Sequence, residues 1–317
     1  MRQISLIFLA GGLLNESPLD ESPLNESPLD ESPLDESPLD ESLSNESSSN
    51  ESSPPFPKCL LKTPDNETIM EKILNIFFSV DYSKYNLELT DSILLYPKNY
   101  LENFERMLKK DDLVFKDKIK LEEAGESLLL TVSKAIESHT KNLNENTFLF
   151  FIATDTPLIT FEAVEDIIKR FSLLEGDLFL PFVSKEVYKV QFGKKLSKNR
   201  TFFKFSKDSF CSTGIFIVKN SVLNNLWEKF KTILEKRKNP IEIIKILGFD
   251  FSTFIKLILG NMTVLELEEK INQMFNVKAH GLLTNFANLA FNIDNKKDLE
   301  NYNEFVSSES IKTYLKI

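Results

Sequence analysis

Cysteine and histidine are scarce in this chain, which has two of each among its 317 residues. Cys59 and Cys211 lie far apart, and neither belongs to a Cys-x-x-Cys pair. Disulfide frameworks and zinc sites both need clustered ligands, so the spacing argues against both. His139 and His280 belong to no motif that we recognise. We therefore assign neither histidine a functional role.

Long apolar runs are missing as well. No stretch reaches the roughly 18 apolar residues that a membrane-spanning helix needs. The run Ile4–Ala10 follows Met1-Arg2 and could be the apolar part of a signal peptide, but it stands at the lower length limit for one. A buried strand is the better interpretation. We therefore expect a cytoplasmic protein without a membrane partner.

Basic residues are absent from the segment 16–53, which contains twelve acidic side chains. These account for the negative net charge of the chain, because 36 acidic and 38 basic residues remain without them. The rest of the chain is nearly neutral and has no long basic stripe. A groove for nucleic acid would need such a stripe. We therefore expect no nucleic-acid partner.

The same segment is a repeat in which Glu-Ser recurs every five residues from position 16 to position 51. Its proline, its unbalanced charge and its few apolar residues predict disorder, because it cannot bury enough surface to offset the entropy of ordering. The repeat could be a partner-binding arm. A tandem expansion in a surface loop is the favoured interpretation, since long loops cost little free energy. Its Asn-Glu-Ser triplets match the glycosylation sequon by chance.

Strands and helices alternate outside the repeat. Short apolar runs predict strands, and apolar spacing of three to four predicts helices. The alternation predicts a three-layer α/β/α fold with a mostly parallel sheet. The predicted strands are Ile4–Ala10, Asp91–Tyr96, Thr147–Thr154, Asp177–Val183 and Gly214–Lys219, and the predicted helices are Thr68–Val80, Glu126–Ser138 and Phe161–Phe171.

The chain divides into five predicted segments. They are the first strand and phosphate loop (1–12), the disordered acidic repeat insert (13–54), the nucleotide-binding α/β core (55–221), a helical C-terminal subdomain (222–277), and a final strand with a C-terminal helix (278–317). The helical subdomain could form one wall of a substrate pocket, although simple core packing is the default interpretation.

Several residues stand where ligands bind in such sheets, at the carboxyl ends of strands. Gly11-Gly12 follows the first strand, and two glycines allow close approach of backbone N–H groups to a phosphate. Lys58 precedes an apolar pair and could bring a charge to a phosphate or be an ordinary surface lysine. Asp155 follows the strongest strand and could bind Mg²⁺ or cap the next helix. Asn292-Ile293-Asp294 could complete a metal site or form a turn.

The order of these pieces resembles the MobA-like NTP transferases, a nucleotidyltransferase family of glycosyltransferase-A-like fold. The resemblance rests on LAGG, PKCLL, a strand ending in TDTPLI, STGIF and NIDNKKDLE, and it covers nearly all of the chain outside 13–54. An uncharacterised bacterial subgroup is the most similar, through Gly125-Glu126-Ser127, through PFVSKE at 181–186, and through RKNP at 237–240 up to Leu247-Gly248.

The resemblance implies the roles of the site residues. Ala10, Gly11 and Gly12 would contact the nucleotide and its phosphates, and Lys58 would neutralise phosphate charge. Asp155 would bind Mg²⁺, with Asp294, or equally Asn292 by alignment, as the second ligand. The implied reaction transfers an NMP from an NTP to a phosphate or hydroxyl acceptor and releases pyrophosphate.

Three alternatives remain beside this reaction. Many family members have an arginine in the first loop, where this chain has Leu13-Leu14, so a degenerate nucleotide-binding protein is one alternative. A sugar-nucleotide-dependent glycosyltransferase of the same fold is another, although such enzymes typically have Asp-x-Asp where this chain has Asp155-Thr156-Pro157. The third is a scaffold whose functional part is the acidic repeat. The base preference, the acceptor and the oligomeric state are not determined by the sequence.

Overall fold

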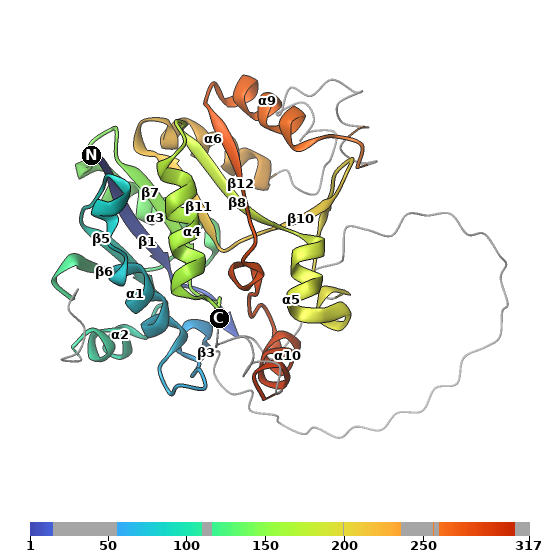
Figure 1. Cartoon of the computed structure of the whole chain (residues 1–317). Coiled ribbons are helices and arrows are strands. Elements are labelled where there is room, and N and C mark those ends of the chain that lie inside the picture. Colours follow the sequence, from blue (N-terminus) through green and yellow to red (C-terminus); the bar gives the residue numbers. More distant parts are fainter. Residues whose placement is uncertain (15–55, 110–115, 199, 236–255, 257–259, 308–317) are drawn as a thin grey trace, which may run out of the picture.

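The chain folds around one large mixed sheet, shown in Figure 1. The computed structural model describes residues 1–14, 56–109, 116–198, 200–235, 256 and 260–307. The predicted repeat insert lies outside the described residues, apart from its first two residues. The segment 237–240, on which part of the family resemblance rests, lies outside them too.

One half of the sheet is parallel. β1 (Arg2–Leu9) lies between β5 (Ser92–Tyr96) and β7 (Phe148–Ala153) and runs parallel to both. β6 (Ile119–Glu123) extends the sheet beyond β5, and β4 (Leu87–Leu89) pairs with the start of β1, both in parallel. The carboxyl ends of β1, β5 and β7 therefore meet at one edge.

The other half is mixed. β11 (Ile215–Lys219) is antiparallel to both β7 and β8 (Leu178–Ser184). β12 (Ala279–Thr284) pairs in parallel with β8, whereas β10 (Ser209–Ser212) and β9 (Phe203–Lys204) add antiparallel pairs. Within the described residues, the sheet is therefore parallel from β6 to β7 and mixed beyond β7. This agrees with the mostly parallel sheet that the strand–helix alternation predicted.

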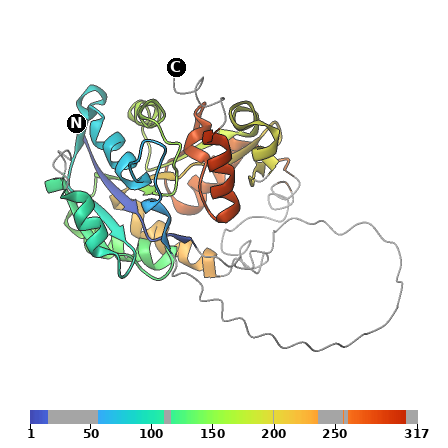
Figure 2. The same ribbon diagram turned by 90° about the horizontal axis from the view of Figure 1, so that it is seen from below.

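Helices cover both faces of the sheet, as Figure 2 shows. One face carries α1 (Ile69–Ser79), α2 (Leu101–Leu108), α4 (Phe161–Ser172), α5 (Lys185–Lys198) and α10 (Lys296–Ser307). The other carries α3 (Leu128–His139), α6 (Asn220–Glu235) and α9 (Val264–Phe275). Short 3-10 turns are η1 (Lys58–Leu60), η2 (Tyr82–Tyr85), η3 (Lys116–Lys118), η4 (Thr140–Asn142) and η5 (Ala287–Ala290).

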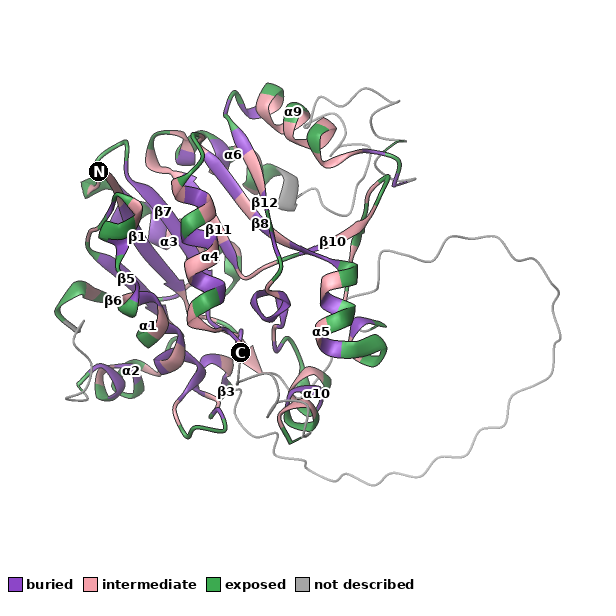
Figure 3. Ribbon diagram, viewed as in Figure 1, coloured by how far each residue is buried: buried purple, intermediate pink, exposed green. Residues whose placement is uncertain are grey.

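The central strands are buried on both faces, and Figure 3 shows them as the core of the molecule. Side chains alternate along β1, so that Ile4, Leu6 and Phe8 pack under α1 and α4 while Ile7 packs toward α3. This two-sided burial explains why ISLIFL reads as a continuous apolar run. The predicted three-layer α/β/α architecture is confirmed.

The segment that was predicted as a helical subdomain contributes α6 and α9, and most of the stretch between them lies outside the described residues. Leu223 and Leu226 of α6 and Phe275 of α9 belong to the buried cluster on the sheet face. These helices therefore serve as cover for the sheet. The division of the chain into five segments stays a prediction.

Candidate functional site

The carboxyl ends of β1 and β7 bring together stretches that lie far apart in the sequence. Leu9 of β1 stands opposite Ala153 of β7, so the loops after both strands leave the sheet side by side. A cavity of about 440 Å³ lies at this edge. Its lining residues are Leu9, Gly11, Gly12, Lys58, Cys59, Glu126, Ser127, Leu128, Thr131, Ala153, Thr154, Asp155, Asn292 and Asp294. We call it the site cavity.

Of the predicted site residues, only Ala10 is missing from this lining. Ala10 is 1% exposed, and its N–H donates to the carbonyl of Leu95 at 2.9 Å. That N–H is therefore used within the fold. The glycines do face the cavity, and Gly11 packs so closely that a Cβ there would lie 3.1 Å from the Cβ of Ala124. Close approach of the backbone explains the glycine.

The first loop closes on itself beyond the glycines. β2 (Leu13–Leu14) pairs antiparallel with β3 (Phe56–Pro57), and the carbonyl of Gly12 accepts from the N–H of Lys58 at 3.1 Å. The two ends of the insert therefore leave and return at the same place. The pairing explains how the chain places Lys58 beside Gly12 despite the intervening repeat.

Lys58 points into the cavity from η1. Its side chain is 12% exposed, and its Nζ lies 3.8 Å from Oδ1 of Asp294, whose side chain is 59% exposed. The neighbouring Cys59 is buried, and burial raises the pKa of its thiol to about 12. The thiol is therefore protonated at neutral pH and unsuited to nucleophilic catalysis.

Two hydrogen bonds fix the backbone of the loop that contains Asp155. The N–H of Ile293 donates to its carbonyl at 2.9 Å, which places Asn292 and Asp294 next to it. The Nζ of Lys72, from α1, donates to the carbonyl of Pro157 at 3.0 Å and anchors the loop that follows. Burial and, to a lesser extent, repulsion from Asp294 raise the pKa of Asp155 to about 6.

Two oxygens in this cluster have no hydrogen-bond partner, namely Oδ1 of Asp155 and Oδ1 of Asn292, and both are buried. Buried polar atoms are rarely left unpaired, because each costs desolvation free energy. Among the described residues there is no group of three or more His, Cys, Asp or Glu side chains that could hold a metal ion. Mg²⁺ does not require one, since it is commonly bound by one or two carboxylates together with substrate phosphates and water. The donor set therefore fits Mg²⁺.

Sequence reasoning assigned no role to one wall of the cavity. Glu126, Ser127, Leu128 and Thr131 line it from the start of α3, where the Ser127 side chain accepts from the N–H of Leu130 and caps the helix. In the sequence, Gly125-Glu126-Ser127 supported only the resemblance to the bacterial subgroup. The serine before an apolar run was the available signal for a helix start at this edge.

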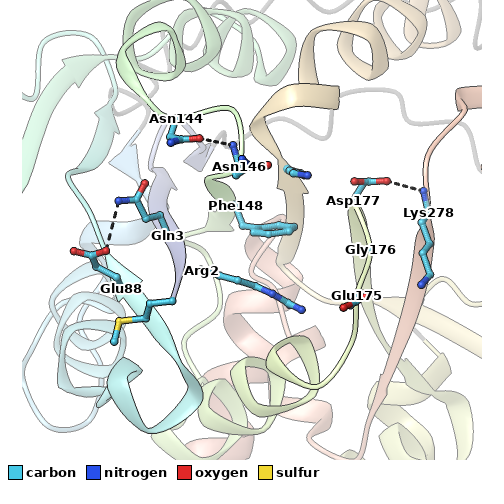
Figure 4. Close-up of a pocket in the computed structure, with 12 residues that line it drawn as sticks. Arg2, Gln3, Glu88, Asn144, Asn146, Phe148, Glu175, Gly176, Asp177 and Lys278 are labelled. Atoms are coloured by element: carbon cyan, nitrogen blue, oxygen red, sulfur yellow. Dashed lines mark hydrogen bonds between the residues drawn. The ribbon is translucent and has the colours of Figure 1, made fainter.

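A second hollow, of about 580 Å³, lies at the opposite end of the strands and is shown in Figure 4. Two of its charged groups, Arg2 and Asp177, form hydrogen bonds within the fold. The guanidinium of Arg2 donates to the carbonyls of Phe171 and Leu174, and Asp177 accepts from the N–H of Lys278. It lies away from the carboxyl ends where sheets of this type bind ligands, and we assign it no function.

Comparison with known proteins gives matches among solved structures. A hypothetical transferase from Thermus thermophilus is 19% identical in sequence and matches with a TM-score of 0.59, covering 94% of this chain and 100% of that chain. The two chains share a fold. No protein-family model and no curated protein matches. The MobA-like family therefore stays a prediction.

Two further structures resemble the chain more weakly. The 4-diphosphocytidyl-2C-methyl-D-erythritol synthase of Anaerococcus prevotii is 11% identical, with a TM-score of 0.49 over 97% of this chain and 99% of that chain. The 2-C-methyl-D-erythritol 4-phosphate cytidylyltransferase of Francisella tularensis is 10% identical, with a TM-score of 0.48 over 96% of this chain and 100% of that chain. Within the described residues, no helix has the length and apolar character to cross a membrane.

Proposed function

We propose that this chain is a metal-dependent nucleotidyltransferase, which transfers an NMP from an NTP to a phosphate or hydroxyl acceptor and releases pyrophosphate. One observation carries the proposal. Gly12, Lys58, Asp155, Asn292 and Asp294, from separate stretches of the chain, line a single cavity at the carboxyl ends of two parallel strands. Ligands of α/β sheets bind at this edge. The fold shared with the hypothetical transferase supports the reaction class.

The site cavity would receive the nucleotide. Its volume lies within the range of small-molecule sites, and its wall combines a glycine backbone with a single basic side chain, Lys58, among the described lining residues. Backbone N–H groups and a lysine ammonium are common phosphate ligands. The wall at Glu126–Leu128 would then contact the remainder of the nucleotide.

Asp155, with Asp294 or Asn292, would hold Mg²⁺ beside the phosphates. Bound there, Mg²⁺ supplies neutralisation of phosphate charge and orientation of the reacting oxygens. The unpartnered Oδ1 atoms of Asp155 and Asn292 support this assignment, because a cation would satisfy both. The exposed carboxylate of Asp294 lies 3.8 Å from the Nζ of Lys58, and both residues line the cavity.

In the reaction, an oxygen of the acceptor forms a bond to the α-phosphorus of the NTP. The bond from that phosphorus to the oxygen bridging to the β-phosphorus breaks, and pyrophosphate leaves with the electron pair. A phosphate acceptor attacks as the anion, and a hydroxyl acceptor loses its proton to water. Lys58 stabilises the negative charge that develops on the leaving group. Asp155, as a ligand of Mg²⁺, would help to orient the phosphates for attack. No protein nucleophile takes part.

Thermal-shift titration with each of the four NTPs, with and without Mg²⁺, tests the proposal, followed by assays of pyrophosphate release. A ligand that binds only the native state raises the melting temperature, and the stabilisation grows with the logarithm of the ligand concentration above its Kd. We expect a shift that requires both NTP and Mg²⁺. Asp155→Asn should reduce turnover by on the order of 10³-fold, because several kcal/mol of charge stabilisation are lost. The exposed Asp117→Asn is the matched control.

Lys58→Met should weaken NTP binding, whereas Lys62→Met should not, because Lys62 is exposed and donates to the carbonyl of Asn66. Equal NTP shifts in both lysine variants would remove Lys58 from the site. Wild-type protein that shows no NTP shift with any base would overturn the proposed function as a whole.

A nucleotide-binding protein without turnover is the second candidate function. It is favoured by Leu13 and Leu14, which pair with β3 and leave the first loop without a basic side chain among its described residues. This candidate predicts the same Mg²⁺-dependent thermal shift but no pyrophosphate release with any acceptor.

A further inference from the structure

Asn288 is a buried polar residue of η5, in the segment that connects β12 to α10 and carries the second candidate metal ligand (Figure 1). Its Nδ2 donates to the carbonyl of Leu158 at 3.0 Å and to Oγ1 of Thr160 at 3.2 Å. Both acceptors belong to the loop that runs from Asp155 to the start of α4. A side chain from one half of the candidate metal site is therefore bonded to the loop that forms the other half.

The two acceptors fix the orientation of the Asn288 amide. A carbonyl oxygen can only accept a hydrogen bond, so the NH₂ group has to face Leu158. Oδ1 of Asn288 is then buried, and it has no partner among the described residues. A buried acceptor without a partner costs free energy. The amide therefore carries a cost, and what it provides is the contact with the Asp155 loop.

A backbone hydrogen bond joins the same two segments nearer to the site. The N–H of Ile293 donates to the carbonyl of Asp155 at 2.9 Å. Ala290 and Phe291 lie between Asn288 and Ile293 in the sequence, and both are buried in the core. The segment therefore has two attachments to the Asp155 loop, with packed residues between them.

Asn288 does not line the site cavity, so its effect on the site would pass through the backbone. The unpartnered Oδ1 atoms of Asp155 and Asn292 lie on the two joined segments, one on each. Mg²⁺ demands near-ideal octahedral geometry, so a change in the separation of its ligands weakens its binding. A clamp between the two segments would keep that separation fixed.

We infer that Asn288 is a positioning residue, which holds the segment of Asn292 and Asp294 at a fixed place relative to Asp155. The inference rests on the proposed nucleotidyl transfer and adds to it a residue that touches neither substrate nor metal. Groups that orient metal ligands typically contribute about 10- to 100-fold to metal affinity or activity. Loss of the clamp should therefore weaken metal binding.

Two asparagine variants separate a clamp from an ordinary structural contact. Asn288→Leu removes both donors and keeps the branched shape of the side chain. Asn220→Leu is the matched control, because Nδ2 of Asn220 likewise donates to backbone carbonyls, including that of Thr140 at 3.2 Å. The N–H of Asn220 donates to the carbonyl of Thr147, which precedes β7 and so lies at the opposite end of that strand from Asp155.

Hydrogen exchange resolved to single amides tests the clamp in the free protein. We expect Asn288→Leu to accelerate exchange at the amide of Ile293 by about tenfold or more, relative to the amide of Leu6 at the centre of the sheet, which reports global unfolding. Asn220→Leu should leave the ratio of these two rates within about twofold of wild type. An unchanged ratio in Asn288→Leu would overturn the inference.

Titration of the full chain with Mn²⁺ in the presence of a non-hydrolysable NTP analogue, followed by electron paramagnetic resonance, tests the consequence for the site. The Kd of Mn²⁺ should rise by about tenfold or more in Asn288→Leu and by less than about twofold in Asn220→Leu. Equal Mn²⁺ affinity in wild type and Asn288→Leu would show that the contact is structural only, and the positioning role would be wrong.

Asn288→Ala removes the same donors without placing methyl groups against the carbonyl of Leu158, and it keeps the test decisive should the leucine variant fail to fold. The same two changes are expected of it, and the same unchanged values would overturn the inference. A wild type that binds neither the NTP analogue nor Mn²⁺ would instead contradict the proposed function. Exchange at Ile293 would then still decide whether Asn288 clamps the two segments.

Discussion

At neutral pH, ionised Asp155 lowers the free energy of unfolding. Burial and the neighbouring Asp294 raise its pKa from 3.8 in the unfolded chain to about 6 in the folded one. The folded state therefore binds a proton more tightly than the unfolded state. The resulting destabilisation is absent below about pH 4 and is complete above about pH 6. A buried carboxyl group with a raised pKa in a cavity is typical of functional sites.

Asp155→Asn should therefore stabilise the fold while it abolishes activity. In metal-free buffer at pH 7.5, we expect the free energy of unfolding to rise by roughly 2 to 3 kcal/mol, since each pKa unit corresponds to about 1.4 kcal/mol. Urea denaturation at pH 7.5 and pH 4 measures it, and the gain should shrink at pH 4. Mg²⁺ should narrow the difference at pH 7.5, because it would stabilise the wild-type carboxylate. A variant less stable than wild type at pH 7.5 would contradict the assignment.

His139 is a second titrating residue, and its role is structural. It is buried below β1, with Nε2 2.7 Å from the hydroxyl of Ser5. Burial lowers the pKa of His139 below its usual value of 6.5. The unfolded chain therefore binds the proton first, so stability is complete above pH 6.5 and decreases as the pH falls below it.

Replacement of His139 by glutamine should flatten this dependence. We expect the free energy of unfolding of wild type to fall between pH 7 and pH 5 more steeply than that of His139→Gln. Denaturant titration across that range measures both slopes. His280→Gln is the control, because His280 accepts or donates only at a surface carbonyl, that of Glu175. Parallel slopes in wild type and His139→Gln would rule out the proposed linkage.

At the scale of elements, the start of α1 can be recognised from the sequence and contributes to stability. Thr68 caps α1 in a capping box, in which its side chain accepts from the N–H of Glu71 while Glu71 accepts from the N–H of Thr68. The interaction satisfies two N–H groups that would otherwise be buried without partners. It is also visible in the sequence as Thr-x-x-Glu before an apolar run.

Thr68→Ala should reduce the free energy of unfolding by about 1 to 2 kcal/mol, the usual loss for a buried cap. Thr232→Ala is the control, because Thr232 is exposed within α6. Chemical denaturation of both variants measures the difference. A loss at Thr232 equal to that at Thr68 would show that removal of the hydroxyl, and not of the cap, is responsible.

Sequence patterns predicted the central strands and one amphipathic helix well. β1, β5, β7 and α4 fall within one or two residues of their predicted bounds, because the strands are continuous apolar runs and α4 has a regular apolar stripe. β6 and α5 were not predicted. β6 has two apolar residues in five and lies at the sheet edge, and α5 contains Gly193 at φ 76° and lacks a clear apolar stripe.

At the scale of the whole molecule, the insert and the fold are joined through two neighbouring strands. Because Leu14 of β2 pairs with Phe56 of β3, a shorter connection can join them without displacing Gly12 or Lys58. The free energy of closing a loop rises only slowly with its length. The acidic repeat is therefore expected to be dispensable for the fold.

Deletion of 16–52 should change the free energy of unfolding by no more than roughly 2 kcal/mol, in the direction of higher stability, because the closed loop is shorter. NTP-dependent thermal shifts should persist. Urea denaturation and the NTP titration measure both quantities. A loss of stability greater than about 3 kcal/mol would show that the repeat is part of the fold. Partner binding by the isolated 13–54 peptide would instead support the scaffold alternative.

The sequence by itself determined the layered α/β architecture, since buried parallel strands and amphipathic helices leave periodic apolar patterns. The order of short motifs shared with the MobA-like family also singled out Lys58, Asp155 and Asp294, although position alone favoured an ordinary surface lysine and a turn for the first and the last. Only the tertiary structure decided that these residues line one cavity. It also decided that the N–H of Ala10 donates to the carbonyl of Leu95. Such relations depend on strand order and long-range packing, which local patterns do not encode.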